Sequence, residues 1–151
     1  MITEKQSLLW MFIGSFIIGL FFNAMNLMAE NISDLYYSLT LFYSAIVMAS
    51  LMCLLVLIMR YFLLKEVSPK WTIFFIFLTF ISIYFLRQQV AVNEYQYLKR
   101  MIPHHSTAIH NSKMLLKRND VSEDIKKLAI NIIESQITEI ATMKEMLRTR
   151  K

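Results

Sequence analysis

The sequence has very little glycine, proline or cysteine. It holds two glycines, two prolines and one cysteine among 151 residues. The scarcity of glycine and proline excludes a collagen-like chain and a flexible low-complexity chain. A lone cysteine, Cys53, excludes a fold stapled by intramolecular disulfides. Because hydrophobic residues make up 56% of the chain, intrinsic disorder is excluded as well.

Charge is scarce in the first half of the chain. Residues 1–86 hold four basic and four acidic residues, whereas residues 87–151 hold twelve basic and seven acidic ones. We therefore predict a transmembrane anchor over residues 1–89 and a charged helical domain over residues 90–151. The basic residues of the second part alternate with acidic ones, and no glycine-rich or aromatic RNA-binding motif accompanies them, so no nucleic-acid partner is expected.

Three long apolar runs lie in the first part. A helix needs about 20 apolar residues to cross the hydrocarbon core of a bilayer. The first two runs are long enough, and basic residues at both ends of the third can reach the two interfaces. The sequence thus predicts an all-α protein with transmembrane helices over about residues 8–28, 35–59 and 71–89, embedded in a lipid bilayer.

The loops predict the orientation in the membrane. The loop over residues 29–34 contains Glu30 and Asp34 and no basic residue, whereas the next loop contains Arg60, Lys65 and Lys70. Basic loops stay on the cytoplasmic side. We therefore expect a cytoplasmic N-terminus and an extracytoplasmic C-terminal domain, on the periplasmic side of a bacterial inner (plasma) membrane.

The C-terminal part has the pattern of two amphipathic helices. Apolar residues recur at helical spacing in two stripes, the first made by Leu98, Ile102, Ile109 and Leu116 and the second by Ile125, Leu128, Ala129, Ile132, Ile133, Ile140, Met143 and Leu147. Residues 118–124 form the turn between the helices. Pro103 either starts the first helix or kinks a rod continuous with the third span. Because a hairpin cannot bury both faces alone, we expect a bundle completed by homo-oligomerisation.

All the histidines fall in one short stretch of the first amphipathic helix. They are His104, His105 and His110, and Met101 and Met114 flank them. Met101 and His105 lie one turn apart on the apolar face, with His104 at its flank. His110 and Met114 lie one turn apart on another side.

The second amphipathic helix places polar residues in its apolar stripe. Gln136, Glu139 and Met143 fall near the centre of this stripe. A buried carboxylate costs several kcal/mol unless it is paired or coordinated, so we expect Glu139 to face His104 or His105. The residues leave two interpretations open: a metal site, or a polar cluster that only fixes the register of the helices.

The donor types favour copper among the metals. Imidazole together with thioether sulfur, without thiolate, selects copper, most readily Cu(I). Zinc bound by two histidines and Glu139 is the alternative, although it would leave the methionines without a role. Ser106 follows the histidines, but no nucleophile-elbow or oxyanion-hole motif accompanies it, and we expect a binding protein rather than an enzyme.

The run from Met101 to Ile109, together with the spacing of residues 128–147, resembles a bacterial family called domain of unknown function 305. The resemblance covers roughly residues 94–148. Members of that family are helical, ferritin-like in packing and extracytoplasmic, and some are implicated in copper binding. The resemblance implies Met101, His104, His105 and Met143 as candidate ligands, with Glu139 and Gln136 as polar partners.

The chain departs from the family pattern in one place. Asn111 stands where many members have a methionine, and His110 stands where an acidic or apolar residue is common. Compared with the family pattern, this departure makes His110 and Met114 a candidate second, weaker metal site. The combined expectation is a membrane-anchored, extracytoplasmic copper-binding protein. The alternative is a structural or interaction protein in which the His–Glu–Gln cluster only stabilises an oligomeric bundle.

Overall fold

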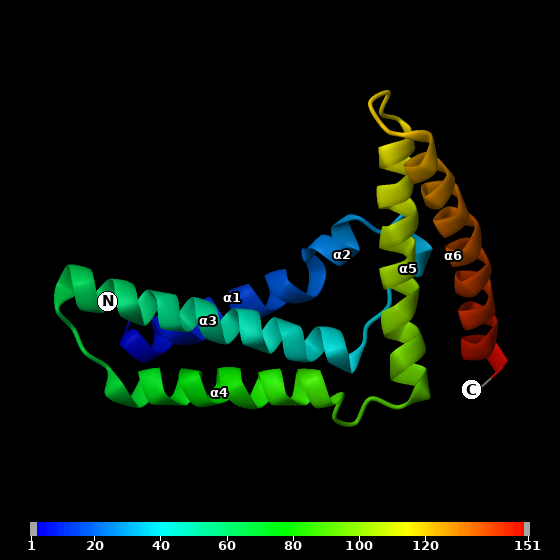
Figure 1. Cartoon of the computed structure of the whole chain (residues 1–151). Coiled ribbons are helices and arrows are strands. Elements are labelled where there is room, and N and C mark those ends of the chain that lie inside the picture. Colours follow the sequence, from blue (N-terminus) through cyan, green and yellow to red (C-terminus); the bar gives the residue numbers. More distant parts are fainter. Residues whose placement is uncertain (1–2, 150–151) are drawn as a thin grey trace. The chain divides into compact units, whose positions relative to one another are not determined.

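The computed structural model describes residues 3–149, and all the regular structure in this range is helical, as predicted. The elements, drawn in Figure 1, are α1 (Glu4–Phe21), α2 (Ala24–Leu27), the 3-10 helix η1 (Ile32–Asp34), α3 (Leu39–Leu64), α4 (Pro69–Gln88), α5 (Glu94–Leu116) and α6 (Glu123–Thr149).

The chain folds as two compact units. One unit joins the chain up to Asn23 with Leu39–Ala91, and the other joins Ala24–Ser38 with the chain from Val92 onward. The sequence-based division placed all of residues 1–89 in one domain. The structure instead assigns the loop between the first two apolar helices to the unit that contains α5 and α6.

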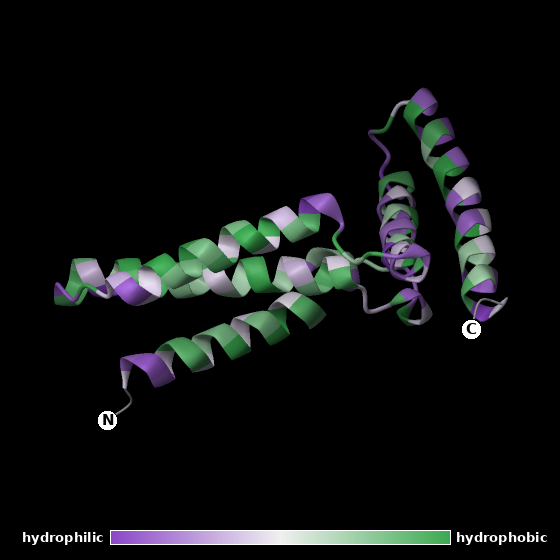
Figure 2. Ribbon diagram, turned by 90° about the horizontal axis from the view of Figure 1, so that it is seen from below, coloured by the Kyte–Doolittle hydropathy of each residue, from purple (hydrophilic) through white to green (hydrophobic). Residues whose placement is uncertain are grey.

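Within residues 3–149, three helices are long and apolar enough to cross a membrane: Glu4–Leu27, Leu39–Leu64 and Pro69–Gln88. Figure 2 shows the hydrophobic colouring that runs along them. The predicted first span over residues 8–28 overlaps the span Glu4–Leu27 and starts later than it does. Within this span, α1 ends at Phe21, where the side-chain amide of Asn23 donates to the carbonyls of Gly19 and Leu20. The second helix starts and ends later than predicted, because residues 35–38 belong to the loop.

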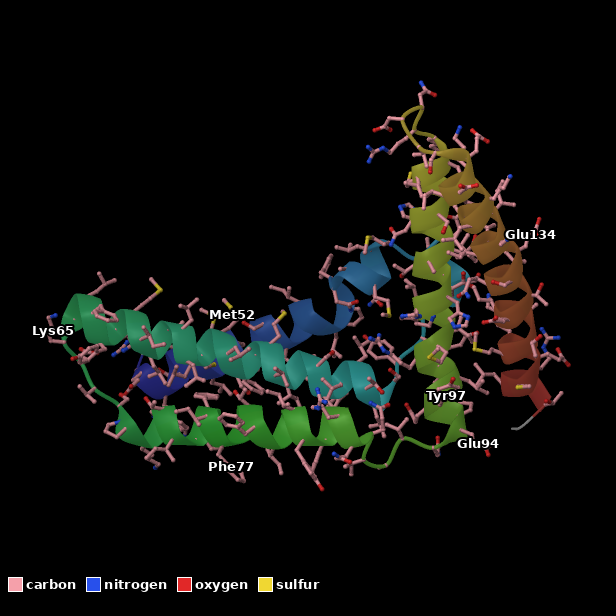
Figure 3. The ribbon with its side chains drawn as sticks, viewed as in Figure 1. Met52, Lys65, Phe77, Glu94, Tyr97 and Glu134 are labelled. Atoms are coloured by element: carbon pink, nitrogen blue, oxygen red, sulfur yellow. The ribbon has the colours of Figure 1, made fainter. Side chains whose placement is uncertain are left out.

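Small residues let α1 and α3 approach closely. A Cβ atom on Gly19 would lie 3.2 Å from the Cα of Ala45, and Ala45 is buried. Close backbone approach through small residues is typical of helix pairs in membranes. On α4, Phe77 projects away from α3 (Figure 3) and is exposed, as a side chain facing lipid would be.

A sharp break separates α4 from α5. Gln89 caps α4 in the left-handed conformation with φ 49°, Ala91 has φ 57°, and the Asn93 side chain accepts a hydrogen bond from the backbone N–H of Gln96 to start α5. The two helices are therefore not one rod. Pro103 lies inside α5, so both expectations for this proline, a helix start and a kink in a continuous rod, were wrong.

Helices α5 and α6 pack against each other through the predicted apolar stripes. The shared core consists of Leu98, Ile102, Ile109, Ile140, Met143 and Leu147. Tyr36, from the loop before α3, packs against this core. Ile125 and Leu128 were expected in the same stripe but are exposed, although Ala129 beside them is buried.

Candidate functional site

His105 is the histidine that α5 directs toward α6. Its side chain is 12% exposed, and its Nδ1 atom lies 3.1 Å from Oε2 of Glu139. Among the described residues, this Nδ1 is a buried polar atom that makes no hydrogen bond. The approach to Glu139 is therefore close in distance but lacks the angle of a hydrogen bond.

The charge state of His105 follows from its surroundings. Burial lowers the pKa of His105 below its ordinary value of 6.5, the negative charge of Glu139 opposes that shift, and His104 adds to it. The lowered pKa leaves the imidazole largely neutral at pH 7. A neutral imidazole nitrogen beside a carboxylate oxygen, without a hydrogen bond between them, is an arrangement that a cation bound by both atoms would stabilise.

Glu139 contacts His105 as expected, but it is not buried. Its side chain is 52% exposed, whereas the sequence placed it near the centre of a buried stripe. The physical reason is that α5 covers only one face of α6, and Glu139 lies at the edge of that face. The cost of burying a carboxylate, which the sequence argument used, is thus largely avoided.

The methionines and the other candidates take different positions around this contact. Met143 is buried in the α5–α6 core, and Met101 packs against the same core. Gln136 is half-buried. His104 is exposed, with its ring tilted against that of His105 at a centroid distance of 5.9 Å. Of the two adjacent histidines, His105 is therefore the one that meets Glu139.

His110 and Met114 have separate partners. Nδ1 of His110 lies 3.5 Å from Oε2 of Glu30, whereas the sulfur of Met114 accepts from the Lys117 ammonium group. Nζ of Lys113 lies 2.6 Å from the other oxygen of Glu30, and this hydrogen bond is the largest influence that lowers the pKa of Glu30. These contacts give His110 and Met114 different partners, and their role as a second metal site stays a prediction.

A buried acid of the loop is a feature that sequence reasoning missed. Asp34 accepts hydrogen bonds from the Ser106 hydroxyl at 2.6 Å and from the Asn31 amide at 3.2 Å, and Nζ of Lys144 lies 2.5 Å from its other oxygen. Burial raises the pKa of Asp34, but these hydrogen bonds outweigh burial and hold it below its ordinary value of 3.8. The sequence offered only the weak signal of acids in a loop without bases.

The donor set limits which metal could bind. Within residues 3–149, no group of three or more His, Cys, Asp or Glu side chains is placed to hold a metal ion. His105 and Glu139 would supply one nitrogen and one oxygen, to which thioether sulfurs could add further ligands. Met143 belongs to the α5–α6 core, and Met101 packs against it.

Comparison with known proteins identifies the C-terminal half. The family described as Domain of unknown function (DUF305) matches residues 86–151. The Uncharacterized protein L153 of Acanthamoeba polyphaga mimivirus is 37% identical over 151 residues, covering 98% of this chain and 95% of that protein. The chain belongs to the DUF305 family. No solved structure matches it significantly.

The comparisons extend the family relationship beyond the DUF305 domain itself. The match to the viral protein includes the three apolar helices as well as α5 and α6. The DUF305 match begins at residue 86, so it does not include the loop over residues 24–38 that folds with this domain. Because this relative is viral, the expected bacterial source and bacterial inner membrane gain no support from it.

Proposed function

We propose that this DUF305 protein is a membrane-anchored, metal-binding protein that holds copper, most readily Cu(I), between α5 and α6. The carrying observation is the buried Nδ1 of His105, which makes no hydrogen bond and lies 3.1 Å from Oε2 of Glu139. Met143 and Met101 would complete the donor set with thioether sulfur, a soft ligand that suits Cu(I). His104 and Gln136 would be neighbours that support the site.

Zinc is the alternative metal for the same residues. Zinc prefers three or four nitrogen, oxygen or thiolate ligands. In the described part of the chain, His, Cys, Asp and Glu side chains do not gather in such a number. The role of the methionines therefore distinguishes the two metals: copper binding would depend on them, and zinc binding would not.

The proposed topology places the DUF305 domain outside the cytoplasm. Residues 24–38 fold in one unit with α5 and α6, which supports a topology in which the first loop and the C-terminal domain would lie on the same side of the membrane. An even number of crossings must then separate them. The helix α3 is the longest and most apolar of the candidate spans, so it would be one of these crossings. The shorter α4 would then have to be the other, and the basic second loop between them would lie in the cytoplasm.

A homo-oligomer would complete the site. Leu128 and Met146 lie on the same helical stripe of α6 as Glu139, and both are exposed apolar side chains. A second copy packed on this stripe would bury them and would also cover the exposed side of Glu139. Size measurement of the full chain in detergent, with Leu128→Gln as the disrupting variant, tests this part of the proposal.

The role proposed is binding rather than catalysis. The hydroxyl of Ser106, the residue next to the candidate ligand His105, is fully buried. It donates to Asp34 and accepts from the backbone N–H of Glu30. These bonds occupy the one hydroxyl group next to the histidines, so it serves the packing of the loop rather than nucleophilic attack.

The test is a Cu(I) titration of the full chain in detergent against a competing chelator. Removing a ligand by His105→Ala or Met143→Leu should weaken binding by about tenfold or more, since perturbing even the partners of metal ligands costs roughly 10–100-fold. Met52→Leu in α3 is the matched control and should change nothing. Copper should also raise the melting temperature of the wild type with increasing concentration.

The structural interpretation makes the opposite prediction. If His105 and Glu139 only fix how α5 packs on α6, the wild type would show no competitive Cu(I) binding, and His105→Ala would lower the melting temperature equally with and without copper. Binding of Zn(II) that survives Met143→Leu but not His105→Ala would identify the zinc alternative instead.

A further inference from the structure

One loop carboxylate contacts both helices of the DUF305 domain. Asp34 lies at the end of η1 with a side chain that is 2% exposed. It accepts from Ser106 on α5, and it pairs with Lys144 on α6. A buried carboxylate is stable only when its hydrogen-bonding and charge requirements are met, so moving either helix away from Asp34 would be costly.

The two helical contacts of Asp34 are sequence neighbours of the proposed metal ligands. Ser106 follows His105, and Lys144 follows Met143. Successive residues of a helix point about 100° apart. When α5 presents Ser106 to the loop, it therefore presents His105 toward α6, and when α6 presents Lys144 to the loop, it presents Met143 to the core.

The second acid of the loop provides a contrast. Glu30 pairs with Lys113 and lies near His110, and both of these residues belong to α5. Glu30 therefore holds the loop to one helix, whereas Asp34 links two. A change at Glu30 should therefore affect only how the loop attaches to α5, whereas a change at Asp34 should also affect the register between α5 and α6.

We infer that Asp34 is a positioning residue: by holding Ser106 and Lys144, it sets the register of α5 against α6 that brings His105 next to Glu139. The part of this inference that concerns metal affinity rests on the proposed function. The part that concerns helix register does not. The loop over residues 24–38 would then be a required element of this DUF305 domain, although the family match begins only at residue 86.

Metal affinity tests the first part in the full chain. Asp34→Asn should weaken Cu(I) binding by about tenfold, the size expected for a partner that orients ligands, whereas Glu30→Gln should leave it within about twofold. Lys144→Met should weaken Cu(I) binding as much as Asp34→Asn does, and the conservative Lys144→Arg should keep most of the wild-type affinity. Wild-type affinity in Asp34→Asn, or an equal loss in Glu30→Gln, would overturn the positioning role.

Cross-linking tests the register without any metal. In a Cys53→Ser background, cysteines replacing His105 and Glu139 are bridged by a short bifunctional thiol reagent. Adding Asp34→Asn should slow the bridging, and adding Glu30→Gln should not. Equal rates in the two variants would refute the register claim. If the wild type binds no Cu(I), the proposed function fails, yet the cross-linking rates still decide whether Asp34 sets the register.

Discussion

The Ser106 hydroxyl of α5 donates a hydrogen bond to the buried carboxylate of Asp34 across 2.6 Å. Two long apolar helices, α3 and α4, separate these residues in the sequence. The bond can form only if both residues lie on the same side of any membrane that the helices cross. It therefore constrains the topology independently of the distribution of basic residues.

Cysteine labelling checks this topology. In a Cys53→Ser background, single cysteines replace Ile32 in the first loop, Asn119 between α5 and α6, and Val67 in the second loop, all of which are exposed. With a membrane-impermeant maleimide on sealed vesicles, Ile32→Cys and Asn119→Cys should react alike, and Val67→Cys should show the opposite accessibility. Equal reactivity of all three would contradict the crossings of α3 and α4.

Acid should destabilise the contact between the loop and the helices. The pKa of Asp34 is held below 3.8 because hydrogen bonds from Lys144, Ser106 and Asn31 outweigh the effect of burial. A group with a depressed folded-state pKa stabilises the fold above its unfolded pKa, and this contribution is lost as pH falls through the folded-state pKa. Stability attributable to Asp34 should thus be present at pH 5–7, roughly, and decline below about pH 4.

Melting temperatures measured between neutral and acid pH check this expectation. The difference between wild type and Asp34→Asn should be constant near neutrality and should shrink as the pH drops below about 4. A difference that grows toward acid would mean that Asp34 is protonated in the folded state. Glu134→Gln, at an exposed position of α6, serves as the carboxylate control.

Two isoleucines of α6 offer a matched test of the core. Ile140 is 8% exposed in the α5–α6 core, whereas Ile137 is 52% exposed on the same helix. Ile140→Ala should destabilise the domain by about 2–4 kcal/mol through lost burial and a residual cavity. Ile137→Ala should cost under about 1 kcal/mol. Thermal unfolding followed by circular dichroism compares them, and equal losses would refute this description of the core.

The two glycines offer a matched test of the α1–α3 contact. A side chain at Gly19 would meet the backbone of Ala45 at 3.2 Å, whereas one at Gly14 would meet nothing within 4 Å. Gly19→Leu should destabilise the fold by roughly 1–3 kcal/mol, the cost of overpacking a tight contact. Gly14→Leu should be tolerated. Melting in detergent distinguishes the two, and tolerance of Gly19→Leu would show that α1 and α3 can separate there.

The local patterns predicted the elements well because they follow from composition and periodicity. The three apolar helices and the stripes of α5 and α6 are present, with the six core residues drawn from those stripes. Helix ends were less well predicted. Where α1 ends, the side-chain amide of Asn23 donates to the carbonyls of Gly19 and Leu20, and Gln89 ends α4 in the left-handed conformation. Both ends depend on local hydrogen bonds and backbone conformation, which the spacing of apolar residues does not report.

The candidate site was predicted in part. Helical spacing correctly placed Met101 and Met143 at the core, and it brought an acid of α6 to a histidine of α5. It placed His105 on the apolar face and His104 at its flank, but it left open which of the two meets Glu139, because the side-chain partners across the interface depend on how the helices pack. It also gave Glu139 a buried position, since a stripe read from one helix does not show how wide a face its neighbour covers.

The sequence by itself determined the helical content, the apolar segments and the family of the C-terminal domain, because each depends on residues close together in the chain. Only the tertiary structure decided that the loop over residues 24–38 folds with that domain and that Asp34 holds α5 and α6 together. A contact between residues so distant in sequence depends on how the helices pack, which no local pattern records.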